Sequence, residues 1–533
     1  MDKQNVFAGR SLCVIEDFTK EERMYLFEQV KVLKKAMEKR DEAKLAPFRI
    51  DNRDFGMYEV FLEDSTRTKE SFRNAANFHH AKVSELNSDS SSFNKGESYA
   101  DTFNTLSGYQ NTIFIIRSKV EGVTRHLEEA CAAYAKRNKL YRKPVFINAG
   151  DGKHEHPTQE LLDEFTFLED NHWSNESLHV ALVGDLFHGR TVHSKADGLK
   201  IFKQVKVDLI APPELAMPDV YVKRMLENGY DVRSFPSIEA YLAQSEVATK
   251  WYFTRPQLER MGDRILQRQE ELRRSITFRE EFMDKIPSGS TFYHPLPRHK
   301  LTPTIPTFLD DTSLNGWERQ SINGMYVRIV LLALLSGKIG SDFLPSVVPE
   351  KNEREDYITE VDLSNRETKE KRVSEGVQPI HNGLVIDHIL KGDSPSEIRR
   401  HMRLISSVLN LDEYKGGEWV STSNTQDAYK GIIFRPGEYS LDRKQLKRLS
   451  AVAPGCTLNL IKDGRVINKF RLHLPPRIYN FEDLACTNEA CISHPDQGEG
   501  VPAMFYRTKE NTFVCAYCNK THTFKEIWKR GSK

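Results

Sequence analysis

Over its first 340 residues the chain alternates short apolar runs with segments of helical periodicity. The runs are compact, rich in β-branched and aromatic residues, and end in Gly, Asp, Pro or Ser: "YEVFLED", "NTIFIIRS", "KPVFINAG", "LHVALVGD", "VDLIAPP", "VATKWYF" and "STFYHPLP". Helical segments such as "HLEEACAAYAKRN" lie between them. This alternation predicts an α/β fold with two doubly wound parallel-sheet domains. Such sheets bind ligands at the carboxyl ends of their strands, so the loops after the runs are the candidate sites.

The remaining chain has a different character. Residues 341–376 include a charge-dense stretch almost free of large apolar residues, which indicates a linker. Residues 377–475 combine strands such as "GLVIDHIL" and "KGIIFRP" with two helical segments and predict an α+β domain. Residues 476–533 hold a cluster of cysteines and predict a small β domain.

Charge and composition exclude some classes of partner. The 533 residues carry 77 Lys and Arg against 76 Asp and Glu, a formal net charge of +1, so we expect no nucleic-acid partner. The N-terminus lacks the pattern of a secretory leader, and the most apolar run, "IVLLALL", is too short to span a bilayer. We therefore expect a cytoplasmic protein without a membrane partner.

The stretch "FLEDSTRTKESF" places several anion-binding groups where a strand leads into a helix. A helix that begins near Ser65 offers free backbone N–H groups and the positive end of its dipole. The hydroxyls of Ser65, Thr66 and Thr68 add donors, and Arg67 adds a guanidinium suited to phosphate oxygens. The pattern is not a Walker loop. The alternative interpretation is that a hydroxyl of this run only caps the helix.

Further cations and amides follow other strands. They are Lys95, Arg117, His156, Gln159, Arg190, Arg255, Gln257 and Arg260, with a proline-fixed loop at Pro295 and Leu296 whose carbonyls can accept hydrogen bonds. His156 alone could be a structural hydrogen bonder. Together these groups predict a cationic cleft for two small anionic substrates, without a nucleophile triad or a catalytic metal.

Four of the seven cysteines form two close pairs. Cys486 and Cys491 are followed, after twenty-three intervening residues, by Cys515 and Cys518, whereas Cys13, Cys131 and Cys456 stand alone and are expected to be buried thiols. Two pairs of thiolates suit a closed tetrahedral site for structural zinc. The alternatives are four unrelated thiols or a zinc module that binds nucleic acid.

Five motifs in order resemble aspartate carbamoyltransferase: "STRT", "HPTQ", "VGDLFHGRTVHS", "TRPQLER" and "HPLPR". The resemblance spans essentially the first 340 residues. It implies a carbamoyl-phosphate-binding domain over 1–155, to which helix 318–340 returns, and an aspartate-binding domain over 156–317. Ornithine carbamoyltransferase, the nearest relative, typically has cysteine in its "HxLP" motif where this chain has Pro295.

The resemblance implies a role for each matching residue. Ser65, Thr66, Arg67, Thr68 and Arg117 would hold the phosphate of carbamoyl phosphate, with Ser91 and Lys95 reaching in from a neighbouring chain. Thr68, Arg117 and His156 would polarise the carbonyl, and Gln159 and the carbonyls of Pro295 and Leu296 would fix the amide. Arg190, Arg255 and Gln257, helped by Lys95, would bind aspartate, and Glu63, Arg190 and Arg260 resemble contacts of domain closure. Preorganised donors would carry the catalysis, because phosphate can take up a proton itself and no catalytic cofactor is needed.

The C-terminal part resembles the regulatory chain of the same family, here fused to the catalytic part. Its effector domain is expected over 377–475 and its zinc domain over 476–533, docked onto the catalytic part. Asp387, His388, Asn459, Ile461 and Lys469 match the family's nucleotide pocket, but Phe434 stands where a second lysine is expected. Nucleotide effectors and a polar strand end without a ligand therefore both stay open. Because Ser91 and Lys95 would act in a neighbouring chain, we expect a homotrimer or a dimer of trimers.

Three other functions stay open from sequence alone. They are a carbamoyltransferase for ornithine or another amine, a regulatory homologue without catalysis, and a zinc protein that binds nucleic acid.

Overall fold

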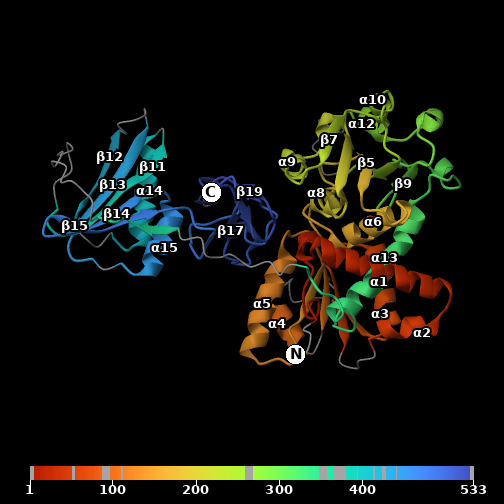
Figure 1. Cartoon of the computed structure of the whole chain (residues 1–533), viewed down its shortest axis with the longest axis horizontal. Helices are drawn as coiled ribbons and strands as arrows, with labels where there is room; N and C mark the ends of the chain where they lie inside the picture. The colour runs from red at the N-terminus through yellow and green to blue at the C-terminus, as the bar shows by residue number, and fades with distance from the viewer. Residues whose placement is uncertain are drawn as a thin grey trace. The chain divides into compact units, whose positions relative to one another are not determined.

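The computed structural model describes residues 5–50, 55–86, 96–109, 112–257, 268–346, 357–363, 380–392, 394–411, 415–422, 428–439 and 441–528. The chain divides into two compact units (Figure 1). The first comprises residues 1–348 with 486–501 and 517–520, and the second comprises 349–485 with 502–516 and 521–533.

The first unit opens with a four-stranded parallel sheet in the order β2-β1-β3-β4. Its strands are β1 (Gly56–Phe61), β2 (Lys82–Leu86), β3 (Ile113–Ser118) and β4 (Val145–Asp151). The helices of this part are α1 (Lys20–Glu38), α2 (Glu42–Leu45), α3 (Thr66–Phe78), α4 (Tyr99–Gly108) and α5 (Val123–Arg137). Every residue of β4 is buried, as expected for a strand covered on both faces.

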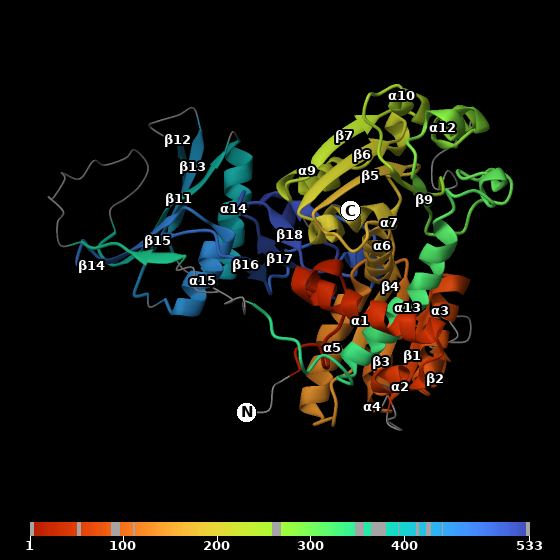
Figure 2. The same cartoon turned by 45° about the vertical axis from the view of Figure 1, so that its right-hand side comes forward.

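A second parallel sheet follows, in the order β7-β6-β5-β8-β9 (Figure 2). Its strands are β5 (Ser177–Val183), β6 (Gln204–Ile210), β7 (Asp231–Phe235), β8 (Lys250–Phe253) and β9 (Thr291–Tyr293). Its helices are α7 (Arg190–His193), α8 (Lys195–Gly198), α9 (Asp219–Glu227), α10 (Ile238–Leu242) and α12 (Gln269–Ile276). The predicted pair of parallel-sheet α/β domains is confirmed.

Two buried helices connect the parts that carry these sheets. α6 (Pro157–Asp170) follows the last strand of the first sheet and precedes the first strand of the second. α13 (Trp317–Leu335) comes after β9 and returns to pack on α6, α3 and α1. The run "IVLLALL" lies in α13 and is buried throughout, so it forms part of the core. No helix of the described residues is long and apolar enough to cross a bilayer.

The second unit contains antiparallel sheets. The larger has the order β10-β15-β14-β11-β13-β12, with strands β10 (Ile358–Glu360), β11 (Gly383–Gly392), β12 (Gly417–Thr422), β13 (Tyr429–Pro436), β14 (Thr457–Lys462) and β15 (Arg465–Leu472). α14 (Pro395–Val408) packs on β11 and β13, and α15 (Arg443–Val452) contacts β15. This is the predicted α+β domain.

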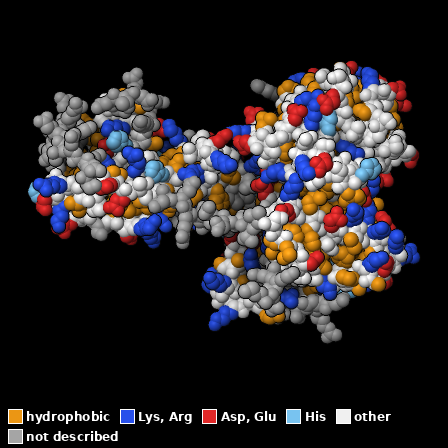
Figure 3. All heavy atoms as spheres, viewed as in Figure 1, with side chains coloured by type: hydrophobic (Ala, Val, Ile, Leu, Met, Phe, Trp, Pro, Cys, Tyr) orange, Lys and Arg blue, Asp and Glu red, His pale blue; other side chains and the backbone are white. Residues whose placement is uncertain are grey.

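A smaller antiparallel sheet completes the second unit. It comprises β16 (Arg477–Tyr479), β17 (Met504–Arg507), β18 (Phe513–Cys515) and β19 (Thr521–His522) in sequential order. Positive and negative side chains are interspersed on the visible surfaces of the chain, which agrees with the near-zero net charge (Figure 3).

Candidate active site and thiol cluster

A cleft of about 440 Å³ lies at the carboxyl ends of the parallel strands of the first unit. Arg117 of β3 and the loops after β1, β4, β5, β8 and β9 contribute to its wall. Twelve predicted residues line it: Ser65, Thr66, Arg67, Thr68, Arg117, His156, Gln159, Arg190, Arg255, Gln257, Pro295 and Leu296. Ser91, Lys95 and Arg260 lie outside the described residues.

The "STRT" run forms the N-terminus of α3, as the sequence predicts. Ser65 is the N-cap residue, yet among the described residues its side chain makes no capping hydrogen bond. Thr68 is 8 % exposed, whereas Ser65, Thr66 and Arg67 are more accessible and line the cleft. The Ser65 hydroxyl is therefore not used to cap the helix, which favours the anion-binding interpretation over simple capping.

Glu63 connects two guanidinium groups at the cleft. Its Oε2 lies 3.1 Å from Nη2 of Arg117 and 2.8 Å from Nη2 of Arg190. Arg117 Nη1 donates to the carbonyl of Ala149 at 3.0 Å, and Arg190 Nη1 donates to that of Gly152 at 3.0 Å. Arg117 lies in β3 of the first sheet and Arg190 begins α7 after β5 of the second, and the two cations converge on one carboxylate.

Gly150 makes room for this convergence. Its φ is +114°, and a Cβ there would lie 2.9 Å from Nη1 of Arg117 and 3.1 Å from Cζ of Arg190. A side chain at this position would be strained and would displace both guanidinium groups. The "NAG" run that ends β4 therefore shapes the cationic wall.

His156 stands at the N-terminus of α6 and is 4 % exposed. Its backbone N–H donates to Ser194 Oγ at 3.3 Å, and its Nδ1 lies 3.4 Å from Thr158 Oγ1. Burial, reinforced by the positive charges of Arg117, Arg190 and Arg328, holds the pKa of His156 well below its ordinary value of 6.5. The imidazole is therefore neutral at pH 7 and can act as a hydrogen-bond donor.

The loops after β5 and β8 form the other end of the cleft. Asp185, fully buried, accepts the backbone N–H of Gln257 at 2.9 Å and that of His188 at 2.9 Å. Gln257 Nε2 donates to the carbonyl of His188 at 3.2 Å. Burial raises the pKa of Asp185, but the hydrogen bonds and charge of His188 outweigh it and lower the pKa. These contacts fix Gln257 beside Arg255 and Arg190 in the cleft wall.

The "HPLP" loop closes the remaining side. His294 donates its backbone N–H to Gln320 Oε1 at 2.8 Å, and its Nδ1 accepts the N–H of Leu296 at 2.7 Å. Burial, with the charges of Arg298, Arg67 and Arg255, lowers the pKa of His294 to about 3. Leu296 adopts a positive φ of 52°. The backbone at Pro295 and Leu296 is thereby held against the cleft.

Sequence reasoning missed several lining residues: His188, Thr254, His294, Gln320 and Arg328. His188 and His294 lie inside quoted motifs and could have been found there. Arg328 sits within the apolar α13 and is 3 % exposed; its Nη1 donates to Ser71 Oγ at 2.8 Å and its Nη2 to Thr158 Oγ1 at 3.3 Å. The only sequence signal for Arg328 is its position between the apolar runs "YV" and "IVLLALL".

Four of the five candidate effector residues share one face of the six-stranded sheet. Asn459 pairs with Val385 and Lys469, Asp387 pairs with Thr457, and Ile461 pairs with Gly383. Their neighbours Leu384, Ile386 and Leu458 are fully buried on the opposite face. Because residues directly paired across strands project from the same face, Asp387, Asn459, Ile461 and Lys469 lie together away from the core. His388 is half-exposed beside Asp387.

Phe434 lies on this same face, paired with Val385. The adjacent Arg435 is directed elsewhere: it is 6 % exposed and bonds to Glu418 at 3.0 Å and to the carbonyl of Gly417 at 2.9 Å. The cation nearest the candidate residues on β13 is instead Lys430, whose Nζ lies 3.4 Å from Asp387 Oδ1. The sequence analysis did not single out Lys430.

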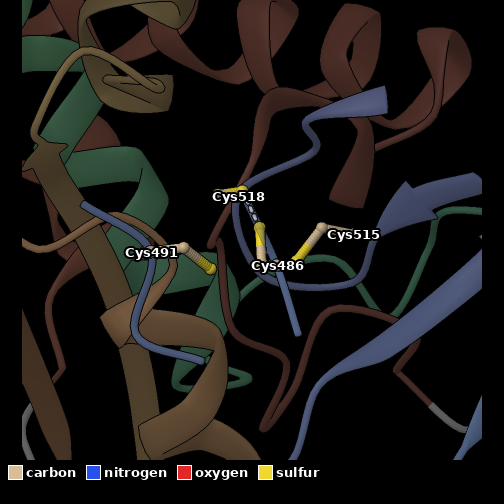
Figure 4. Close-up of side chains that lie close together, drawn as sticks. All are labelled: Cys486, Cys491, Cys515 and Cys518. Atoms are coloured by element: carbon tan, nitrogen blue, oxygen red, sulfur yellow. Dashed lines mark hydrogen bonds between the residues drawn. The ribbon is translucent and has the colours of Figure 1, made fainter. Parts of the chain in front are cut away.

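Cys486, Cys491, Cys515 and Cys518 form one buried cluster (Figure 4). Their sulfur atoms all lie within 4.8 Å of one another, and those of Cys486 and Cys518 are 3.6 Å apart. Four thiolates around a tetrahedral zinc at about 2.3 Å would be separated by about 3.8 Å, so the donor set fits such an ion. Cys13, Cys131 and Cys456 are buried individually, as expected.

Four family descriptions match the chain in succession. They are the aspartate/ornithine carbamoyltransferase carbamoyl-P binding domain over 10–169, the Asp/Orn binding domain over 176–335, the aspartate carbamoyltransferase regulatory chain allosteric domain over 375–473, and its metal binding domain over 476–528.

Similar proteins extend over the whole chain. Protein PyrBI of Treponema denticola is 67 % identical over 98 % of this chain and 99 % of its own, and protein PyrBI of Thermotoga maritima is 50 % identical over the same shares. The aspartate carbamoyltransferase catalytic subunit of Methanosarcina barkeri is 30 % identical over 62 % of this chain and 99 % of its own.

Solved structures resemble the catalytic part. Aspartate transcarbamoylase of Trypanosoma cruzi in complex with N-(phosphonacetyl)-L-aspartic acid matches 62 % of this chain and 97 % of its own with a TM-score of 0.52 and 26 % identity. The catalytic subunit of M. jannaschii aspartate transcarbamoylase matches 61 % of this chain and 96 % of its own with a TM-score of 0.52 and 28 % identity. The chain therefore belongs to the aspartate carbamoyltransferase family, as a member in which the catalytic and regulatory parts are fused in one polypeptide.

Proposed function

We propose that the cleft transfers the carbamoyl group of carbamoyl phosphate to the amine of L-aspartate, giving N-carbamoyl-L-aspartate and phosphate for pyrimidine biosynthesis. The observation that carries this proposal is the convergence of the "STRT" helix N-terminus, four arginines and a neutral His156 in one cleft. Three anionic groups, one phosphate and two carboxylates, match that excess of donors and cations.

The phosphate occupies the N-terminus of α3. The uncapped hydroxyl of Ser65, the N–H groups that follow it and the guanidinium of Arg67 offer a set of donors directed at one anion. Arg117 adds a second guanidinium from β3. Ser91 and Lys95 complete the site from a neighbouring chain of a homotrimer.

The carbamoyl carbonyl is polarised by Thr68, Arg117 and His156. Attack by the aspartate amine builds negative charge on this oxygen, and preorganised donors stabilise that charge without reorganisation. A neutral imidazole can donate one N–H to the oxygen while its other nitrogen accepts from Thr158. Gln159 and the carbonyls of Pro295 and Leu296 hold the amide end. The departing phosphate takes up the proton released by the amine.

Aspartate is bound by Arg190, Arg255 and Gln257, with Lys95 of the neighbouring chain. The carboxylate of Glu63 bridges the guanidinium groups of Arg190 and Arg117. The phosphate and carboxylates of the substrates can pair with Arg117 and Arg190 in the same way as Glu63 does. Substrate binding then replaces Glu63 as the partner of these guanidinium groups and draws the loops of both sheets toward the substrates.

A substrate comparison tests this proposal. The purified chain is assayed for carbamoyl transfer to aspartate and to ornithine, and Arg255→Gln is compared with Arg137→Gln on the exposed end of α5. We expect transfer to aspartate alone, a KM for aspartate raised by more than about tenfold in Arg255→Gln, and wild-type kinetics in Arg137→Gln. Transfer to ornithine, or no transfer by the wild-type chain, would overturn the assignment.

We further propose that the four clustered thiolates bind structural zinc and that the open face of the six-stranded sheet binds a nucleotide effector. Lys430 supplies a cation beside Asp387 where Phe434 and Arg435 do not. Aspartate saturation curves measured with purine and pyrimidine nucleotides test the second point. Curves that no nucleotide shifts would make this face structural rather than regulatory.

A further inference from the structure

A buried group of charges lies behind the carbamoyl end of the cleft. Three acids of α6 contribute to it, Glu160, Asp163 and Glu164, and all are at most 1 % exposed. Lys195 of α8, which is fully buried, lies 2.9 Å from Glu160 Oε2 and 2.7 Å from Asp163 Oδ2. Glu164 is paired separately with Arg23, at 2.5 Å.

Stability alone does not explain why the ion pair of Lys195 and Asp163 is buried. Removing a lysine and an aspartate from water costs several kcal/mol per ion in general, and the attraction between them often does no more than offset that cost. Lys195 and Asp163 are fully desolvated, and neither lines the cleft. They can affect the geometry of the cleft only through the other contacts of Asp163.

The second oxygen of Asp163, Oδ1, bonds to side chains on both sides of the part of the cleft that would bind the carbamoyl group. Oδ1 accepts from Nε2 of Gln159 at 3.0 Å and from Nε2 of Gln320 at 2.6 Å. Gln320 then accepts the backbone N–H of His294 at 2.8 Å through its Oε1, and His294 holds Leu296. One carboxylate thus orients the side chain of Gln159 directly and the 294–297 loop through Gln320.

The chemistry of the carboxylate fixes the direction of both amides. An ionised carboxylate only accepts hydrogen bonds, so each glutamine must turn its NH2 group toward Asp163 and its oxygen away. Lys195 forms an ion pair with the other carboxylate oxygen, Oδ2, at 2.7 Å. The oxygen of Gln159 and the backbone carbonyls of the 294–297 loop are then left as acceptors for a substrate that carries N–H donors.

We propose that Lys195 and Asp163 are positioning residues that make the cleft selective for a carbamoyl group over an acyl group without N–H donors. The proposal rests on the function proposed above, in which this end of the cleft binds the amide of carbamoyl phosphate. It assigns to Lys195, which belongs to none of the recognised binding positions, a role in substrate choice that is exerted through Gln159 and Gln320.

Acetyl phosphate is the probe, because a methyl group replaces the NH2 group and the phosphate is unchanged. The selectivity is the inhibition constant of acetyl phosphate divided by the KM of carbamoyl phosphate, with aspartate saturating. The variant Asp163→Asn/Lys195→Met removes the charges as a pair. Glu164→Gln/Arg23→Met is the matched control, since it removes the neighbouring ion pair of α6 without a contact to Gln159.

We expect the selectivity to fall about tenfold or more in Asp163→Asn/Lys195→Met, the loss expected for one misdirected hydrogen bond. It should stay unchanged in Glu164→Gln/Arg23→Met, although both variants lose thermal stability. Equal selectivity in the two variants would overturn the proposal. A wild-type chain that does not carbamoylate aspartate would instead refute the proposed function, so the two failures are distinguishable.

A second pair of variants covers the case in which the first does not fold. Gln320→Leu breaks the connection between Asp163 and the 294–297 loop and leaves the ion pair of Asp163 and Lys195 in place. Asn323→Leu removes another buried amide one turn along α13, whose partners are Thr166, Glu169 and Lys34. Selectivity should fall in Gln320→Leu and not in Asn323→Leu, and an unchanged value in a folded Gln320→Leu would also overturn the proposal.

Discussion

His156 lies in the positive field of three arginines, and this determines how it can act. Burial and the charges of Arg117, Arg190 and Arg328 hold its pKa well below 6.5. A native-state pKa below the unfolded value means that the neutral form is the one stabilised by folding. The contribution of His156 to stability is therefore present above about pH 6.5 and is lost as the pH falls through the native pKa.

The same shift predicts a pH-independent effect of replacing His156. In His156→Ala we expect kcat to fall about 10² to 10³-fold, as for loss of one oxyanion donor. The ratio of wild-type to variant kcat should be constant from pH 6 to 9, because the imidazole stays neutral throughout. Steady-state kinetics at saturating substrates measure it. A ratio that declines toward one below pH 6.5 would show a group that titrates near its ordinary pKa.

Individual residues of the cleft were predictable to different degrees. Residues at or after the carboxyl ends of strands, such as Arg117, His156 and Arg190, could be located because parallel strands end at one edge of their sheet. Arg328 and Gln320 could not, because they face the cleft from within a helix whose sequence mainly indicates burial. Lys195 and Asp163 read as ordinary charged residues, since a sequence does not show that two distant charges are buried together.

The N-terminus of α3 differs from an ordinary capped helix, and this difference can be measured. Thr19 caps α1 in a full capping box with Glu22, whereas the Ser65 side chain makes no capping bond among the described residues. We expect Thr19→Ala to cost about 1 kcal/mol of unfolding free energy with no change in KM. Ser65→Ala should leave stability nearly unchanged and raise the KM for carbamoyl phosphate. Denaturant unfolding and initial rates separate the two effects.

The reverse pattern would contradict this account. If Ser65→Ala destabilised the chain as much as Thr19→Ala and left the KM unchanged, the hydroxyl would serve the helix and not a ligand.

The strands that sequence reasoning found are those with continuous apolar runs, such as β3, β4 and β5. Among the strands it missed are β2, β7 and β12, each at an edge of its sheet, and β10, which lies within the predicted linker. The residues of the first three, "KVSEL", "DVRSF" and "GEWVST", are largely polar and only partly buried. An edge strand that is only partly covered tolerates charge, so its sequence lacks the apolar run that identifies a buried strand. β4 is also at an edge of its sheet, but it bridges to Leu12 through Ile147, is buried throughout and keeps its apolar run.

The seven thiols of the whole chain should fall into two classes. Burial raises the pKa of Cys131 to about 11 and that of Cys456 to about 12, and raises that of Cys13 as well, so these thiols are protonated and inert. The other four are expected to be thiolates bound to zinc, which would contribute roughly 10 to 16 kcal/mol to the folding of the C-terminal module.

Metal removal tests this division. A thiol reagent should modify no cysteine rapidly in the metal-loaded chain. After treatment with a strong chelator, one zinc and four reactive thiols per chain should appear together, and the other three should react only in denaturant. Metal analysis with a timed thiol titration measures both numbers. Release of metal with fewer than four thiols would show a different ligand set.

The proposed site is complete only when several chains assemble. Arg67 lines the described cleft, whereas Lys95 is proposed to reach into the cleft of a neighbouring chain. Arg67→Ala and Lys95→Ala chains should each be almost inactive alone. In a mixed trimer a complete site forms wherever a Lys95→Ala chain, which keeps Arg67, is followed by an Arg67→Ala chain, which keeps Lys95.

Random exchange of equal amounts of the two variants gives that order at about a quarter of the sites, because each of the two positions is correct half of the time. The mixture should therefore recover about 25 % of the wild-type kcat per site. Exchange is verified with chains that carry different mass labels, and unmixed samples treated identically are the control. If exchange is complete and no activity returns, Arg67 and Lys95 act within one chain, and the requirement for a trimer disappears with the shared site.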